Sequence, residues 1–101
     1  MTDRELLFED FNSRVNGRFA MRDEYGHASE IVLIECTGRQ PTNDSRSFTL
    51  LFHGAADAPA IQGMYLLSAE DFEPAPVFLV PVRRTSDGVE YDAVFNHHNG
   101  G

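Results

Sequence analysis

VFLVPVRRTSDGVEYDAVFN (Val77–Asn96) contains two apolar runs separated by a short polar segment. That segment includes Asp87-Gly88, a pair that is common in tight turns. In the second run every other residue is apolar, namely Val89, Tyr91, Ala93 and Phe95. Such alternation is typical of a strand with one face on a core, so the stretch predicts a β-hairpin.

The first strand of this hairpin, from Val77 to Val82, is apolar on both faces and contains Pro81. Proline has no N–H to donate to a neighbouring strand. We therefore predict that the side facing away from the hairpin partner is an edge, or carries a bulge, at Pro81. We assign Leu79 to the face opposite the main core.

The rest of the chain predicts one helix and four more strands. Thr2 and Glu5 have the spacing of a capping box, and apolar residues follow at helical spacing, which predicts a helix from about Asp3 to Arg14. An alternative ends this helix near Asp10, because poor helix formers follow. Apolar runs predict strands at residues 18–22, 30–36, 47–53 and 61–68.

Together these elements predict a mainly β fold of about six antiparallel strands in a small barrel or sandwich, with one N-terminal helix. Polar residues predict exposed loops at 37–47 and 70–76. Gly63 predicts a bulge or a close backbone approach within its strand. Residues 1–96 are expected to form a single domain, and residues 97–101 a disordered tail.

Composition narrows the possible partners and the compartment. The chain has 101 residues, which suits one domain, and its net charge of −8 disfavours binding to nucleic acid or anionic membranes. The single cysteine, Cys36, lies in an apolar run and fits a buried position in a reducing compartment. The acidic N-terminus lacks the features of a signal peptide, so we expect a soluble, cytoplasmic protein.

Several predicted strands carry apolar residues on the face opposite the main core. These residues are Ile31, Leu33, Leu51, Tyr65, Leu67 and Leu79. The predicted helix is too short to cover all of them, and exposed apolar patches commonly mark interfaces. Our hypothesis is that a protein partner, or a second copy of the chain, covers this face.

Candidate catalytic and metal-binding groups have weak support in the sequence. Adjacent His97 and His98 would point to opposite faces of a strand, and the other two histidines lie far away in the chain. The carboxylates at 70–73 and 90–92 resemble solvated charges, and burial argues against Cys36 as a nucleophile. The chain has no glycine-rich phosphate loop and no CxxC, GxSxG or HExxH motif. We therefore predict no catalytic residue, no metal site and no cofactor.

Four segments in the chain carry a recurring pattern of an aromatic strand, QGxY, FLVPV and YDAxFN. They are FTLLFHG (48–54), IQGMYLLS (61–68), VFLVPV (77–82) and YDAVFN (91–96). In this pattern the last half of the chain resembles a family of small bacterial β-rich domains of unknown function. Relatives are encoded near phage-tail-collar-like proteins, so the resemblance implies an accessory or assembly role without an established activity.

The leading hypothesis is a non-enzymatic protein-interaction or assembly module, associated with a phage-tail-like structure. Its predicted partner-binding residues are Gln62, Tyr65, Leu79 and Tyr91. A first alternative is a small-ligand-binding barrel or a small enzyme, with its site at one open end formed by His53, Tyr65 or Glu35. A second is an acidic immunity or mimic protein that blocks a basic partner through Glu70, Asp71, Glu73, Glu90 and Asp92.

Overall fold

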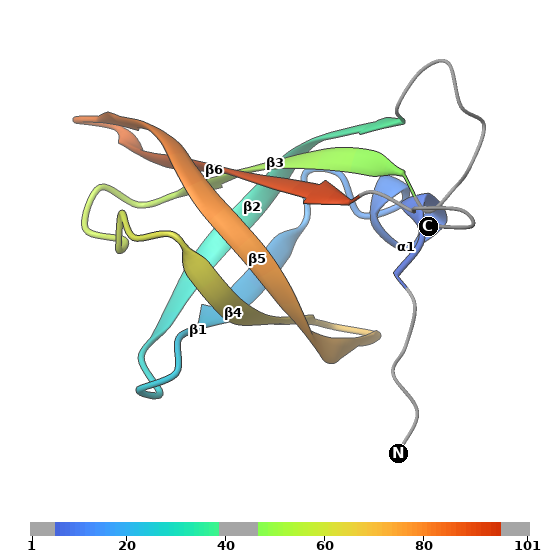
Figure 1. The fold of residues 1–101 in the computed structure, drawn as a ribbon, viewed down its shortest axis with the longest axis horizontal. Coiled ribbons are helices and arrows are strands. Elements are labelled where there is room, and N and C mark those ends of the chain that lie inside the picture. Colours follow the sequence, from blue (N-terminus) through green and yellow to red (C-terminus); the bar gives the residue numbers. More distant parts are fainter. Residues whose placement is uncertain (1–5, 39–46, 96–101) are drawn as a thin grey trace, which may run out of the picture.

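In the part of the chain that the structure describes, six antiparallel strands form a closed barrel with one short helix (Figure 1). A computed structural model describes residues 6–38 and 47–95; the predicted tail and most of the loop predicted at 37–47 lie outside them. The elements are α1 (Phe8–Asn12), β1 (Arg18–Arg22), β2 (Ala28–Gly38), β3 (Phe48–Gly54), β4 (Gly63–Ala69), β5 (Phe72–Thr85) and β6 (Gly88–Phe95). Around the barrel the strand order is β1-β2-β3-β6-β5-β4. The predicted fold class is confirmed.

The predicted hairpin of residues 77–96 is formed by β5 and β6. The β4–β5 ladder ends at Leu79, so Pro81 has no strand beside it on that side. The β5–β6 register then shifts between Pro81 and Arg83, which is a bulge. The prediction of an edge or a bulge at Pro81 is therefore confirmed.

The segment from Phe72 to Pro76 belongs to β5, so the prediction of a loop over 70–76 is wrong. Pro76 lies opposite Leu66 of β4. On its other side, β5 pairs with β6 only from Val80 onward. Among the described residues, no strand pairs with β5 on the β6 side at these prolines, so on that side their missing N–H costs no described ladder hydrogen bond.

The helix α1 is shorter than the predicted helix of residues 3–14. Its start is stabilised by the Leu7 N–H, which donates to Asp10 Oδ2 at 2.8 Å. Asn16 adopts a left-handed φ of 74° and its N–H donates to the backbone of β2, which directs the chain into β1. The predicted capping box at residues 2–5 lies outside the described residues.

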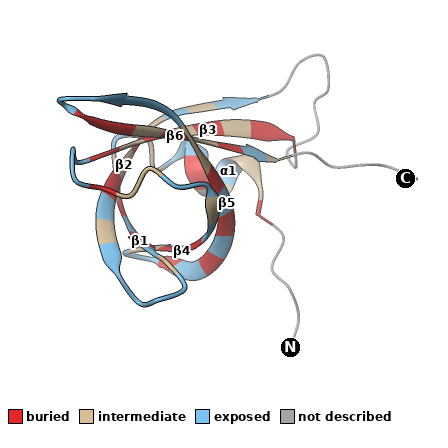
Figure 2. Cartoon of the chain, turned by 60° about the vertical axis from the view of Figure 1, so that its left-hand side comes forward, coloured by how far each residue is buried: buried red, intermediate tan, exposed pale blue. Residues whose placement is uncertain are grey.

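The helix α1 lies at one end of the barrel (Figures 1 and 2), and aromatic side chains pack together there. Phe11 of α1 is completely buried. The centroid of its ring lies between 5.3 and 6.2 Å from those of four others, Phe19, Phe48, Phe72 and Phe95. α1 therefore plugs this end of the barrel.

The connection between β3 and β4, residues 55–62, closes the opposite end (Figure 1). Ala58 in this connection is buried. The Tyr91 hydroxyl donates a hydrogen bond to the Pro59 carbonyl, and the Tyr65 hydroxyl donates to the Ile61 carbonyl at 2.6 Å. Two tyrosines that point into the barrel thus hold the connection in place.

Three strands face the core with the side that the sequence analysis assigned to the outside. Ile31, Leu33, Tyr65, Leu67 and Leu79 all lie in the core, with at most 5% of their surface exposed. These strands are apolar in both phases of the alternation, so the pattern alone does not assign a face. Strand pairing assigns it, because a shift of one residue would exchange the two faces.

The prediction of a bulge or close approach at Gly63 is also wrong. Gly63 is the first residue of β4 and pairs with Leu79 of β5. A Cβ added there would meet no atom within 4 Å. The bulge in β4 lies between Leu67 and Ala69 instead.

Candidate functional site

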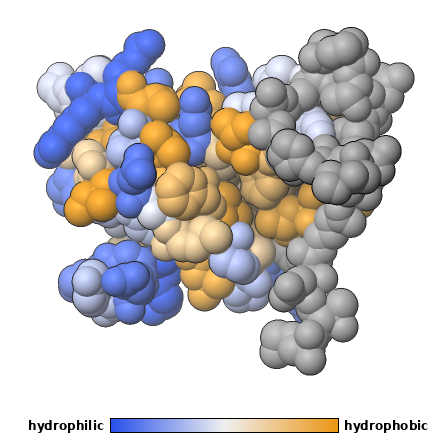
Figure 3. Space-filling model, in the orientation of Figure 1, coloured by the Kyte–Doolittle hydropathy of each residue, from blue (hydrophilic) through white to orange (hydrophobic). Residues whose placement is uncertain are grey.

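An apolar patch covers the outer face of β4 and β5. We call it the β4–β5 face and define it by four exposed residues: Met64, Leu66, Pro76 and Phe78. In the antiparallel register Met64 lies directly opposite Phe78, and Leu66 lies opposite Pro76. Met64 is 61% exposed and Phe78 is 49% exposed, so neither side chain is used by the barrel core. Figure 3 shows apolar side chains gathered on this side of the molecule.

The β4–β5 face continues into a hollow between the β1–β2 turn and the start of β4. This hollow, of about 340 Å³, is lined by Tyr25, Ile61, Gln62 and Met64, among others. Tyr25 and Ile61 are the two most exposed large apolar residues among those described, at 78% and 67%. The apolar surface therefore extends from β5 to the end of the barrel. The rim of the hollow is acidic, because Asp23 and Glu24 also line it.

Asp23 holds the turn that presents Tyr25. Its Oδ1 accepts hydrogen bonds from the backbone N–H groups of Tyr25 and His27, both at 2.9 Å. Desolvation raises the pKa of Asp23, but these hydrogen bonds and the nearby His27 outweigh it and lower the pKa below its ordinary value. Gly26 completes the turn with a φ of 90°, which residues with a Cβ rarely adopt. Tyr25 is thus exposed on an ordered turn.

Of the four predicted partner-binding residues, only Gln62 lies on the surface. It lines the hollow beside the β4–β5 face. Tyr65, Leu79 and Tyr91 point into the barrel, so a partner on the outer surface would not reach their side chains. The sequence analysis missed Met64 and Phe78 because both phases of β4 and β5 are apolar. Only the register between the two strands shows that Met64 and Phe78 lie on the outer face.

Tyr65 and Tyr91 have a structural role that the sequence did not reveal. Their hydroxyls donate to carbonyls of the β3–β4 connection, as described above. Burial raises the pKa of Tyr91 to about 12, with a further contribution from Tyr65 and an opposing one from Arg84. Burial also raises the pKa of Tyr65, and the charge of Asp23 adds to this. Both tyrosines therefore stay protonated donors well into the alkaline range.

We expect the stability of the barrel to fall between pH 10 and pH 12, because unfolding releases the Tyr91 proton in this range. The ordinary pKa is 10.0 and the pKa in the barrel is about 12, so the loss amounts to roughly 2–3 kcal/mol. Urea unfolding at several alkaline pH values measures it. In Tyr91→Phe the free energy of unfolding should fall less over this pH range, by about this amount. Tyr25→Phe changes an exposed site, so its free energy of unfolding should fall as much as that of the native chain. Equal declines in all three proteins would contradict the assignment.

The groups of the enzyme alternative do not converge. Tyr65 points inward, Glu35 is exposed on β2, and His53 lies on the outer face of β3, 4.0 Å from Glu90. Burial raises the pKa of the Cys36 thiol to about 11, so little thiolate forms at neutral pH. Within residues 6–38 and 47–95, no three His, Cys, Asp or Glu side chains are grouped to hold a metal ion.

The comparisons with known proteins identify a family. The model of the family described as "Domain of unknown function (DUF6916)" matches residues 6–95. The chain belongs to this family. The DUF6916 domain thus includes α1, all six strands and the β4–β5 face, and the predicted membership of a family of unknown function is confirmed. No curated protein and no solved structure gives a significant match to this DUF6916 domain.

No helix in the described part of the DUF6916 domain is long and apolar enough to cross a membrane. Its only described helix, α1, has five residues.

Proposed function

We propose that this domain is a non-enzymatic protein-interaction module that binds through the β4–β5 face. The observation that carries the proposal is the exposed cross-strand pair of Met64 and Phe78. A folded domain gains nothing from leaving two large apolar side chains in water at neighbouring positions. Exposed patches of this kind commonly mark protein interfaces.

The expected contribution to binding is substantial for a small surface. Fully burying a Met or Phe side chain contributes about 1.5–3 kcal/mol. About half of each side chain is still exposed, so covering both contributes roughly 1.5–3 kcal/mol together. This corresponds to about a tenfold to hundredfold change in Kd.

The alternative of a small-ligand-binding barrel has less support. Aromatic rings around Phe11 fill one end, and residues 55–62 close the other. The polar groups of His53, Tyr65 and Glu35 face different directions. A ligand site requires a cavity with converging polar groups.

The alternative of an acidic mimic is also less well supported. Its acidic residues divide between the β4–β5 turn, with Glu70 and Asp71, and the outer face of β6, with Glu90 and Asp92. Arg83 Nε lies 3.7 Å from Glu90, which partly neutralises the second group. A mimic that blocks one basic site needs its charges on one surface.

The biological setting follows from the resemblance to the bacterial family and remains part of the proposal. We place the module in the assembly of a phage-tail-like structure, as an accessory component. In this setting the protein is made in the cytoplasm, and its partner is another protein or a second copy of the chain.

Affinity capture from cells that encode the protein tests this proposal. The native chain should retain proteins that the double variant Met64→Asp with Phe78→Asp loses. The matched control is Val94→Asp, the same kind of change at a residue that is 53% exposed on β6 and pairs with β3. The control should retain the same proteins as the native chain. Identical capture by all three chains would show that binding does not use the β4–β5 face.

A further inference from the structure

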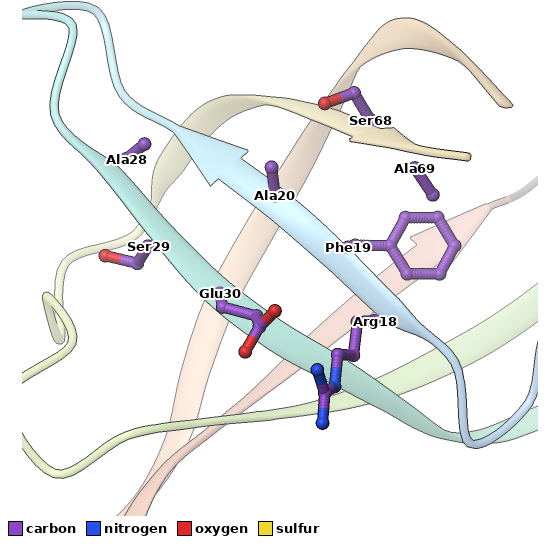
Figure 4. Close-up of a pocket in the computed structure, with 8 residues that line it drawn as sticks. All are labelled: Arg18, Phe19, Ala20, Ala28, Ser29, Glu30, Ser68 and Ala69. Carbon is purple, nitrogen blue, oxygen red and sulfur yellow. The ribbon is translucent and has the colours of Figure 1, made fainter.

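A second hollow lies next to the β4–β5 face, across β2, β1 and β4 (Figure 4). We call it the β1 hollow; its volume is about 450 Å³. Small side chains line it, including Ala20, Ala28, Ser68 and Ala69. Ala20 lies at its centre, since it pairs with Glu30 of β2 on one side and with Ser68 of β4 on the other. The outer surface is therefore recessed where side chains are small.

The β1 hollow and the β4–β5 face share a border. Arg22 of β1 pairs with Ala28, which lines the hollow, and with Leu66, which belongs to the β4–β5 face. An exposed apolar area thus adjoins a recess. A two-fold contact is self-complementary, so in such a contact each copy presents both parts to the other.

The charges around these two surfaces are complementary under the same symmetry. Arg18 lines the β1 hollow and Arg22 lies on its border, whereas Asp23 and Glu24 line the hollow beyond the β4–β5 face. Among the residues that line the β1 hollow, Glu30 is acidic and lies beside Arg18 (Figure 4). Glu70 lines an adjoining hollow together with Arg18. The whole chain has a net charge of −8, but this surface carries nearly balanced charge. A two-fold contact places the basic side of one copy against the acidic side of the other.

We propose that the occupant of the β4–β5 face is a second copy of this chain, in a two-fold dimer. Met64 and Phe78 of each copy fill the β1 hollow of the other. Near the symmetry axis, Arg22 of each copy faces Glu24 of its partner. This inference deepens the proposed function and rests on it.

The contact uses side chains and not strand pairing. All six strands are paired in the closed barrel. Where β5 pairs with no described strand on the β6 side, it contains Pro74 and Pro76, and proline on an edge prevents added strands from pairing. The dimer is therefore expected to depend on apolar and charged side chains.

Sedimentation equilibrium of the purified chain, up to about 1 mM, tests the proposal. We expect the native chain to dimerise with a measurable Kd. Phe78→Asp removes the raised apolar area and Ala20→Arg fills the recess, so each should raise the Kd at least about tenfold. Val94→Asp, on another face, should leave the Kd within about twofold. Circular dichroism confirms that each variant is folded.

A charge exchange tests the two-fold arrangement directly. Arg22→Glu alone and Glu24→Arg alone place like charges against each other at both symmetric contacts, so each should weaken dimerisation about tenfold. An equal mixture of the two variants restores opposite charges at both contacts, so it should form a mixed dimer with nearly the native Kd.

The dimer proposal is wrong if the native chain stays monomeric at about 1 mM. It is also wrong if the mixture of Arg22→Glu and Glu24→Arg dimerises with a Kd no lower than that of each variant alone. Dimers unaffected by Phe78→Asp and Ala20→Arg would also overturn it. If the chain is monomeric but still captures proteins through the β4–β5 face, the dimer is wrong and the proposed function stands. If the chain neither dimerises nor captures proteins through this face, both are wrong.

Discussion

Replacing Phe11 by alanine is expected to lower the free energy of unfolding by about 3–5 kcal/mol. Phe11 is completely buried and contacts four other phenylalanine rings at the end of the barrel. Removing its ring leaves a cavity that short α1 and the rigid strand ends cannot fill. A domain of this size is stable by about 5–15 kcal/mol, so the variant should be marginally stable or partly unfolded.

Urea unfolding followed by circular dichroism measures this loss. The control is Glu9→Ala, which changes an exposed residue on the same helix and should alter the stability by about 0.5 kcal/mol or less. A loss below about 1 kcal/mol for Phe11→Ala would mean that α1 does not plug the barrel.

Replacing Gly88 by alanine should lower the free energy of unfolding by about 4 kcal/mol, because backbone strain and overpacking act together. Gly88 begins β6 with a φ of 152°, a conformation that residues with a Cβ rarely adopt. An added Cβ would lie 2.1 Å from the Gly54 carbonyl oxygen and 2.7 Å from His53 Nε2. The oxygen belongs to the backbone of β3, so relieving the clash requires β3 and β6 to separate.

Gly63→Ala is the matched control for this prediction. Gly63 also begins a strand, but an added Cβ would meet no atom within 4 Å. The stability should therefore change by less than about 1 kcal/mol, with a small gain from the stiffer unfolded chain. Thermal unfolding of both variants checks the pair. Similar melting temperatures for the two would show that Gly88 is not constrained by its φ or by β3.

The parts of the fold that the sequence predicts well are those with a single physical interpretation. In β3 and β6 apolar and polar residues alternate at most positions, Leu51 and Val94 excepted, so the inward positions of Phe52 and Tyr91 follow from the pattern. Pro81 has one chemical property, the missing N–H, and this predicted the break in pairing. Asp87-Gly88 marked the turn between β5 and β6 for a similar reason.

The sequence does not predict the parts of the fold for which two different structures fit the same pattern of residues. In β4 and β5 both phases are apolar, so Leu79 and Phe78 were equally good candidates for the core. Pro74 and Pro76 favoured a loop, because a pattern does not show that β5 has a free side there. The predicted helix ran past Asn12, where α1 ends and poor helix formers follow; Asn16 then donates to Leu33 of β2, a contact that is distant in sequence.

The sequence by itself therefore determined the number of strands, their antiparallel order along the chain and the inward face of those that alternate. Only the tertiary structure decided that the sheet closes, that Tyr65, Leu79 and Tyr91 lie inside it and that Met64 and Phe78 lie outside. The physical reason is register. Alternation tells which residues share a face, but only pairing with neighbouring strands tells which of the two faces is toward the core.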